Sequence, residues 1–334
     1  MFNGQVFALS LALSVILGCY ASPSFRFTNS GLSSNVDKGS ADSHKALGSN
    51  SGGGLRTGPR LATNCPMTYD KKDRSAQRKL NRAMRKAKAA GFNATVSFPA
   101  ITIPVHFHII ATNMTYEGGW NSKEDVEAQM RVLNEDFRDA SVSFEVTQVD
   151  RIVNSTWYWE VGLGDPISDE MKLKLKTGGP ETLNVFTTSL LPLSNMTSGY
   201  ASFPWLYSDI GSPVLGGPHR DGVTMDHKVF YGGAFEGVND GRYLTHEVGH
   251  WVGLYHTFEG GCDGPGDFVD DTPAQAEKSD VFDFECVPHD SCPHLPGVDL
   301  KSNFMDYSNP VCQKSFTPGQ ILRMRNSLQM FRGY

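Results

Sequence analysis

Three histidines and one glutamate lie close together in the sequence at a spacing that suits a metal site. His246 and His250 are four residues apart, so on an α-helix both side chains lie on one face and can bind the same ion. Glu247 would lie beside that ion, where its carboxylate can act as a general base. Neutral imidazole nitrogens are zinc ligands, and three of them leave a fourth position for water. The segment therefore predicts a catalytic zinc centre.

The third ligand is expected to be His256, which follows His250 by six residues. At about 100° per residue a continuing helix would carry it to the wrong side. The helix must therefore end first, and Gly253 can adopt the positive φ that ends it at little cost. Gly249 lies inside the helix, where glycine costs about 1 kcal/mol relative to alanine. A site with little space for a side chain explains that glycine better than the alternative, which is an ordinary amphipathic helix with polar residues on its solvent-exposed face.

The chemistry that this arrangement predicts is hydrolysis. Zinc lowers the pKa of its bound water from about 15.7 to about 7. Glu247 is expected to take the proton as the hydroxide attacks a scissile carbonyl, and then to pass it to the leaving amine.

The complete string from His246 to His256, His-Glu-x-x-His-x-x-Gly-x-x-His, resembles that of the metzincin zinc endopeptidases. A methionine turn follows the zinc motif in those enzymes, and Asn303–Tyr307 fits it. The surrounding sequence resembles that of the pappalysin (cytophagalysin) family, especially its secreted fungal members. The stretches that carry this likeness are His246–Cys262, Asp270–Pro273 and Phe316–Gln320. The similarity covers roughly residues 100–330 and is dense only after about residue 240.

The resemblance implies roles for further residues. Met305 would form the floor of the site by packing, and Tyr307 would donate a hydrogen bond to the tetrahedral intermediate. A core tyrosine is the alternative for Tyr307. Pappalysin relatives bind calcium, and the matching positions here are Asp267, the Val269 carbonyl and Thr272. Oxygen ligands at close spacing suit Ca²⁺, and a solvated acidic loop is the alternative.

Four of the six cysteines lie in the active-site half: Cys262, Cys286, Cys292 and Cys312. An oxidising compartment favours their pairing, and four cysteines allow three connectivities. The family resemblance implies the crossed one, Cys262–Cys292 with Cys286–Cys312. Cys65 is then left without a partner.

The N-terminus is typical of an exported protein. Residues 5–17 form an apolar run that is too short to cross a bilayer, and small Ala21 follows it, so residues 1–21 are interpreted as a signal peptide. A bacterial lipoprotein site at Cys19 is the alternative. Four sequons, at Asn93, Asn113, Asn154 and Asn195, favour a secreted glycoprotein. No later run reaches membrane-spanning length, so we expect a soluble, extracellular monomer with neither membrane nor nucleic acid as partner.

The charge of the chain divides near residue 88. The net charge is +10 up to that residue and −16 beyond it, which together give −6. Residues 22–60 are rich in Ser, Gly and Asn and cannot bury a core, whereas the apolar spacing in the basic stretch 71–88 permits a helix. Because the chain is exported, we interpret that stretch as a solvated segment or processing site, not as a nucleic-acid site. Residues 22–97 are thus expected to be a disordered basic leader or pro-segment, with the Cys65 thiolate capping the zinc until cleavage.

Beyond the leader, residues 98–334 are expected to form one catalytic domain of the α+β class. Strands are predicted at 101–110, 142–153, 183–190, 199–204 and 223–231, and helices from Ser122 and at 165–177 and 318–331. The resemblance implies a metzincin-type mixed twisted sheet with backing and active-site helices to about residue 253. A loop-rich, disulfide-stapled part, 254–334, would follow.

The first predicted strand contains a proline and two histidines. Pro104 indicates that the strand is not central. His106 and His108 share one face of it, and we expect them to be polar strand residues and not metal ligands.

We therefore predict a secreted zinc-dependent endopeptidase acting on proteins or peptides, with Gly199–Pro204 binding the substrate backbone as the family implies. One alternative is an inactive zinc-binding secreted glycoprotein, against which the intact Glu247 argues. Another is a peptidase clan with a distant glutamate as third ligand, against which His256 argues. Arginine-preferring pappalysins have an acidic residue just before the last cysteine of the cluster. Val311 holds that position, so we expect no such preference.

Overall fold

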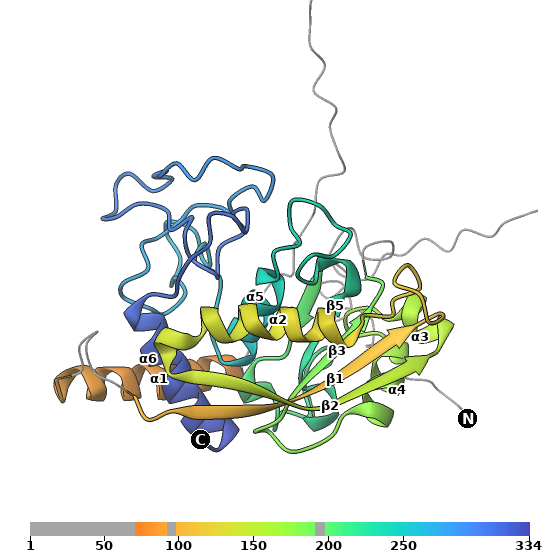
Figure 1. The fold of residues 1–334 in the computed structure, drawn as a ribbon. Coiled ribbons are helices and arrows are strands. Elements are labelled where there is room, and N and C mark those ends of the chain that lie inside the picture. The colour runs from red at the N-terminus through yellow and green to blue at the C-terminus, as the bar shows by residue number, and fades with distance from the viewer. Residues whose placement is uncertain (1–70, 92–97, 191–197) are drawn as a thin grey trace, which may run out of the picture. The chain divides into compact units, whose positions relative to one another are not determined.

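The computed structural model describes residues 71–91, 98–190 and 198–334 (Figure 1). One five-stranded sheet forms the centre of residues 98–334, in the order β2-β1-β3-β5-β4. The strands β2, β1, β3 and β5 are parallel, and β4 pairs antiparallel with β5 at the edge. The strand bounds are β1 Ile101–Ala111, β2 Val142–Val153, β3 Leu183–Thr188, β4 Gly199–Ala201 and β5 Val223–Asp226. The expected mixed sheet is therefore confirmed.

The α-helices are α1 Lys71–Ala89, α2 Lys123–Asp136, α3 Ser155–Glu160, α4 Pro166–Leu175, α5 Arg242–Trp251 and α6 Pro318–Ser327. Short 3₁₀ turns are η1 Arg138–Ala140, η2 Pro204–Leu206, η3 Pro218–Arg220 and η4 His227–Val229, and the π turn η5 Leu328–Arg332 continues α6. Capping residues explain where several helices begin. Ser122 starts α2 with a capping box to Asp125, and Thr317 starts α6 with one to Gln320.

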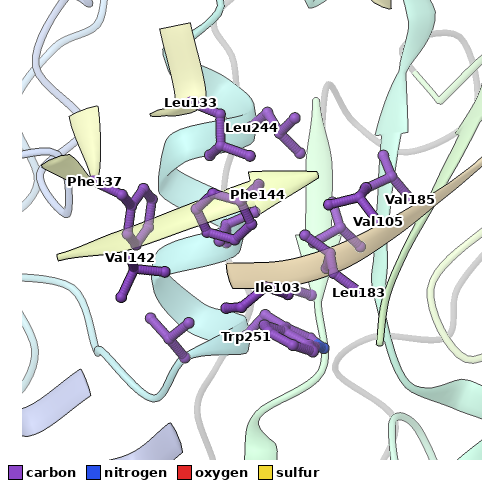
Figure 2. Close-up of a cluster of buried hydrophobic side chains, with 14 of the residues drawn as sticks. Ile103, Val105, Leu133, Phe137, Val142, Phe144, Leu183, Val185, Leu244 and Trp251 are labelled. Carbon is purple, nitrogen blue, oxygen red and sulfur yellow. The ribbon is translucent and has the colours of Figure 1, made fainter. Parts of the chain in front are cut away.

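The main hydrophobic core lies on one face of the sheet, between the strands and helices α2 and α5. Alternate residues of β1, from Ile103 to Ile109, point into it. Figure 2 shows Leu133 of α2 beside Leu244 of α5, Phe137, which directly follows α2, near Phe144 of β2, and Trp251 of α5 beside Ile103. Because α5 carries the predicted zinc motif, this core fixes the helix that bears the site.

A second, smaller core covers the opposite face of the sheet. Ile110 of β1 and Phe186 of β3 belong to it, together with Tyr158 of α3 and Met171 of α4. The short helix α3 was not predicted from the sequence. It starts at Asn154, whose side chain accepts a hydrogen bond from the Trp157 amide.

The prediction from Pro104 was wrong, because β1 lies between β2 and β3. The pairing with β3 runs only from Val105 to Ile109, however, so Pro104 lies where β1 has a neighbour on one side alone. A proline, which lacks the amide donor, is tolerated at such a position.

Residues between α5 and α6 are mainly loop and turn (Figure 1), as expected. Two disulfides cross-link this part, Cys262–Cys292 and Cys286–Cys312, with S–S distances of 2.08 Å in both. The pairing is the crossed one that the family resemblance implies.

The disorder expected for residues 22–97 does not hold over α1. Ala76, Leu80 and Met84 recur at helical spacing and are buried, and α1 packs on α6 and η2. Gln77, also buried, donates a hydrogen bond to the Tyr255 hydroxyl at 2.9 Å and accepts one from Arg323. Helix α1 therefore belongs to the same compact unit as residues 98–334. The helices of the described ranges are all too short or too polar to span a bilayer.

Candidate metal centre and active site

Helix α5 presents three functional side chains of the zinc motif. His246 and His250 lie one turn apart, their ring centroids 4.8 Å from each other, and Glu247 lies beside them. All three side chains are buried. Gly241, with φ of 87°, starts the helix in a conformation that glycine adopts without strain.

The helix ends before it can carry the chain past the site. Gly253 has φ of 105°, as the sequence predicts, and a Cβ at that position would lie 2.5 Å from the Ser327 hydroxyl oxygen. The chain then reverses so that His256 returns to the two helical histidines. Its Nε2 lies 3.1 Å from Nε2 of His250.

The three histidines converge on one point. One ring nitrogen from each of His246, His250 and His256 lies within 4.8 Å of the other two. Nδ1 of His246 lies 2.7 Å from the Phe304 carbonyl, and Nδ1 of His250 lies 2.8 Å from the Leu254 carbonyl. A carbonyl only accepts, so each Nδ1 carries the proton and each Nε2 presents a lone pair to the common point.

The donor set fits a metal ion. Nε2 of His246 is buried and has no hydrogen-bond partner among the described residues. Burial lowers the pKa of His246 to about 4 and holds the pKa values of His250 and His256 well below their usual range. The rings therefore stay neutral at physiological pH, which is the form that binds zinc.

Glu247 faces the edge strand β4. A Cβ placed on Gly199 would lie 3.0 Å from Oε1 of Glu247, so glycine leaves room for the carboxylate. Burial raises the pKa of Glu247 to about 8 in the metal-free chain. A divalent cation at the histidines would oppose that shift, because it favours the charged carboxylate.

The methionine turn lies directly under α5. A Cβ on Gly249 would lie 2.3 Å from Sδ of Met305, which explains why glycine stands inside this helix. The amide groups of Asn303 and Gln320 exchange two hydrogen bonds of 2.7 and 3.0 Å. Oδ1 of Asn303 also accepts a bond from the Met305 amide, at 2.9 Å. The turn is thereby tied to α6 as well as to α5.

Tyr307 lies against the histidines. Its ring centroid is 5.4 Å from that of His246 and 4.8 Å from that of His256. The ring is half-buried. The Phe258 ring packs against both Tyr307 and His256, with ring-centroid distances of 4.9 Å and 4.7 Å.

Comparison with known proteins places this site in a family. The chain matches the profile of the Peptidase M43 family, described as pregnancy-associated plasma protein-A, over residues 216–329. An extracellular metalloprotease of Pyricularia oryzae is 38% identical over 252 residues, which is 75% of this chain and 83% of the relative. This chain belongs to the pappalysin family. It is accordingly a metalloendopeptidase.

Other pappalysin relatives agree in sequence and in fold. An extracellular metalloprotease of Colletotrichum graminicola is 40% identical, over 70% of this chain and 78% of the relative. Mature mirolysin of Tannerella forsythia, solved with a cleaved peptide, superposes with a TM-score of 0.56 at 27% identity, covering 71% of this chain and 98% of mirolysin. A promirolysin mutant gives a TM-score of 0.58 at 25% identity, over 77% and 90%.

The expected calcium positions of this pappalysin lie close to one another. Asp267 is buried, and its Oδ1 accepts hydrogen bonds from the Val269 amide at 3.0 Å and the Thr272 hydroxyl at 2.7 Å. Its Oδ2 is buried with no hydrogen-bond partner among the described residues. Burial raises the pKa of Asp267 to about 7. An unpartnered carboxylate oxygen beside a carbonyl and a hydroxyl fits Ca²⁺.

Of the remaining predicted positions, which are the sequons and two cysteines, some lie within the described residues and some outside them. Asn113 is exposed and Asn154 half-buried, so both sequons lie at the surface. Asn93, Asn195, Cys19 and Cys65 lie outside the described residues.

Sequence reasoning missed the groups that hold the motif in place. The carbonyls of Phe304 and Leu254 orient two rings, and Gly199 makes room for Glu247. Backbone groups carry no signal of their own in a sequence. The only hint was position, since Phe304 directly precedes the methionine of the predicted turn.

Proposed function

We propose that His246, His250 and His256 bind zinc and that the protein uses it to hydrolyse peptide bonds. The observation that carries the proposal is the convergence of three neutral imidazoles, two of them held by backbone carbonyls, on one buried point. A bound zinc ion would supply a Lewis acid and lower the pKa of a water molecule there.

Glu247 is the general base of this proposal. It lies next to the histidines on α5 and faces the strand where a substrate would lie, so it can take a proton from the attacking water. It can then give that proton to the leaving amine. Tyr307, with its ring against His246 and His256, is placed to donate a hydrogen bond to the developing oxyanion.

Strand β4 is the proposed binding edge for the substrate backbone. It pairs with β5 on one side and ends the sheet on the other, and its Gly199 lies against Glu247. An extended peptide that adds to this edge would bring a carbonyl to the base. Mirolysin has been solved with a cleaved peptide. We therefore expect protein or peptide substrates, cleaved by a monomer.

Calcium at Asp267, the Val269 carbonyl and Thr272 is a further part of the proposal, because Oδ2 of Asp267 is buried and no described residue forms a hydrogen bond with it. We also propose secretion with a signal peptide at residues 1–21 and glycosylation at the four sequons. Relatives named extracellular metalloproteases support an extracellular location.

We further propose that the chain before α1 is a pro-segment in which Cys65 occupies the fourth zinc position. A pro-form of the related mirolysin is known. The uncleaved protein and its Cys65→Ala variant should be compared on a peptide substrate before any processing. Faster cleavage by the variant supports the proposal, and equal rates contradict it.

The main experiment is cleavage of casein with and without a zinc chelator. We expect a chelator to abolish cleavage and added zinc to restore it. His256→Ala should lose cleavage and one equivalent of zinc, whereas the control His289→Ala, at an exposed histidine, should keep both. Chelator-resistant cleavage, or an active His256→Ala variant, would contradict the proposed centre.

A further inference from the structure

A second group of two histidines and a carboxylate lies on the other face of the sheet from α5. His106 and His108 alternate on β1 with the residues that point into the main core. Asp150 of β2 is the register partner of His108 in the parallel pair. Both histidines are buried, while the Asp150 side chain keeps 37% of its surface exposed. The group is therefore open to solvent on the aspartate side only.

The distances in this group are those of a ligand set. Nε2 of His106 lies 2.8 Å and Nδ1 of His108 lies 3.7 Å from the same oxygen, Oδ2 of Asp150. One atom from each of the three residues lies within 4.8 Å of the other two. Ligand atoms on a tetrahedral ion with bonds of about 2.0–2.2 Å are about 3.4 Å apart. Small side-chain movements would bring all three atoms to that spacing.

Hydrogen bonds fix which nitrogen of His108 carries the proton. Oδ1 of Asn184 accepts a bond from the Thr177 amide at 3.0 Å, and the Asn184 amide group donates to the Thr177 carbonyl at 2.9 Å. The orientation of Asn184 is therefore set by backbone. Its Oδ1 lies 3.0 Å from Nε2 of His108 and can only accept, so Nε2 is the protonated nitrogen.

The lone pair of His108 is consequently on Nδ1, which is buried and has no hydrogen-bond partner in the described part of the chain. It faces a carboxylate oxygen, so two acceptors oppose each other with no donor between them. A metal ion bound between these two atoms would accept both lone pairs.

His106 and Asp150 are also held in position for a shared ligand. Nε2 of His106 donates a hydrogen bond to Oδ2 of Asp150 at 2.8 Å, because a carboxylate only accepts, and Nδ1 lies 2.5 Å from the Thr177 hydroxyl. Since that hydroxyl can also accept, the ring proton can be held on Nδ1 when an ion binds Nε2. Gln148 donates to Oδ1 of Asp150 at 2.8 Å, which directs Oδ2 to the histidines. Such outer hydrogen bonds orient metal ligands and raise their affinity.

We propose that His106, His108 and Asp150 form a second metal site, separate from the catalytic one, that binds a divalent first-row transition ion with zinc as the best match. Two imidazoles and one carboxylate suit zinc, and water completes its tetrahedron from the exposed side. The proposal replaces our expectation that these histidines are only polar strand residues. An ion here would link β1 to β2 and stabilise the fold by mass action.

The test is the zinc content of the full chain at increasing free Zn²⁺, measured by equilibrium dialysis and mass spectrometry. Wild type should bind a second equivalent that Asp150→Asn lacks, or binds at least ten times more weakly. Asparagine keeps the size of the side chain and its exposed position, so the variant should fold. Glu145→Gln removes the same charge from an exposed position of β2 and should retain the second equivalent.

A second measurement separates this site from adventitious binding. Occupation of the second equivalent should raise the melting temperature of wild type and of Glu145→Gln but not that of Asp150→Asn, and casein cleavage should be alike in all three. The inference is overturned if wild type binds a single zinc ion. It is equally overturned if Asp150→Asn and His108→Gln both keep the second equivalent.

Discussion

Glu247 and the three motif histidines depend on neighbours that are distant in the sequence. The Phe304 carbonyl fixes the His246 ring, and Sδ of Met305 occupies the space that a side chain at position 249 would need. A catalytic group held in this way loses its function through loss of its own chemistry or through loss of its support. Substitutions of Glu247 itself test the first case.

Glu247→Gln should keep the metal and lose activity. The three histidines remain, whereas the amide cannot accept the proton of the attacking water, so kcat should fall by about 10²–10⁴. Zinc content and peptide cleavage should be measured on the same preparation. Glu236→Gln changes an exposed glutamate and serves as control. If Glu247→Gln keeps more than a few per cent of wild-type turnover, another residue is the base.

Calcium should stabilise the protein more at pH 8 than at pH 5. Burial raises the pKa of Asp267 in the folded metal-free chain to about 7, above its ordinary value of 3.8. The folded state therefore favours the protonated form, and without calcium it loses stability as the pH rises through 7. Calcium binds only the carboxylate, so its effect grows over the same range.

Thermal unfolding of the zinc-loaded protein with and without calcium, at both pH values, measures this difference. Asp267→Asn should remove the calcium effect at either pH, and Asp263→Asn, at an exposed aspartate, should leave it intact. An equal calcium effect at pH 5 and pH 8 would contradict the assignment of Asp267.

At the scale of elements, helix α5 is held in place by η5 as well as by the sheet. Arg332 of η5 is buried 3.9 Å from the Trp251 ring centroid and bonds both oxygens of Asp221 at 2.9 and 2.8 Å. Asp221 also accepts a bond from Nε1 of Trp251 at 3.3 Å. The last turn of the chain thus fixes the C-terminal end of the helix that carries the site.

Helix α1 should contribute measurably to stability. Leu80 is fully buried between α1 and the body of the protein, so Leu80→Ala should lower the free energy of unfolding by about 2–5 kcal/mol. Lys79→Ala, one residue earlier on the exposed face, should change it by about 0.5 kcal/mol or less. Denaturant unfolding compares the two variants, and equal stability would show that α1 is not docked in solution.

At the scale of the whole molecule, the docking of α1 bears on where the chain is processed. Arg85 and Lys86 lie inside α1, whereas Lys71 and Lys72 lie at its start. A protease binds its substrate extended, so cleavage after Arg85 requires α1 to unwind and leave α6. We therefore expect processing at Lys71–Lys72 or before, with α1 kept in the mature enzyme.

N-terminal sequencing of the secreted protein tests this expectation. An N-terminus at or before residue 73 agrees with it. An N-terminus after Arg85 would show that α1 is removed, and Leu80→Ala, which loosens the helix, should then be processed faster than Lys79→Ala.

The sequence alone determined what depends on local spacing. The four-residue interval of His246 and His250, the glycine that ends the helix before His256 and the capping residues of α2 act through neighbours a few residues away, so periodicity and turn chemistry reveal them. Family resemblance added the disulfide pairing and the methionine turn.

Only the tertiary structure decided what depends on contacts between distant residues. Gly249 against Met305, the Phe304 carbonyl on His246 and Gln77 on Tyr255 join segments that are far apart in sequence, and no local pattern encodes them. The sequence predicts that His106 and His108 are polar strand residues, because a strand pattern shows which face of the sheet a side chain takes. It does not show which residue of the neighbouring strand lies opposite. The fold brings Asp150 to that face, and within the described ranges Nδ1 of His108 has no hydrogen-bond partner.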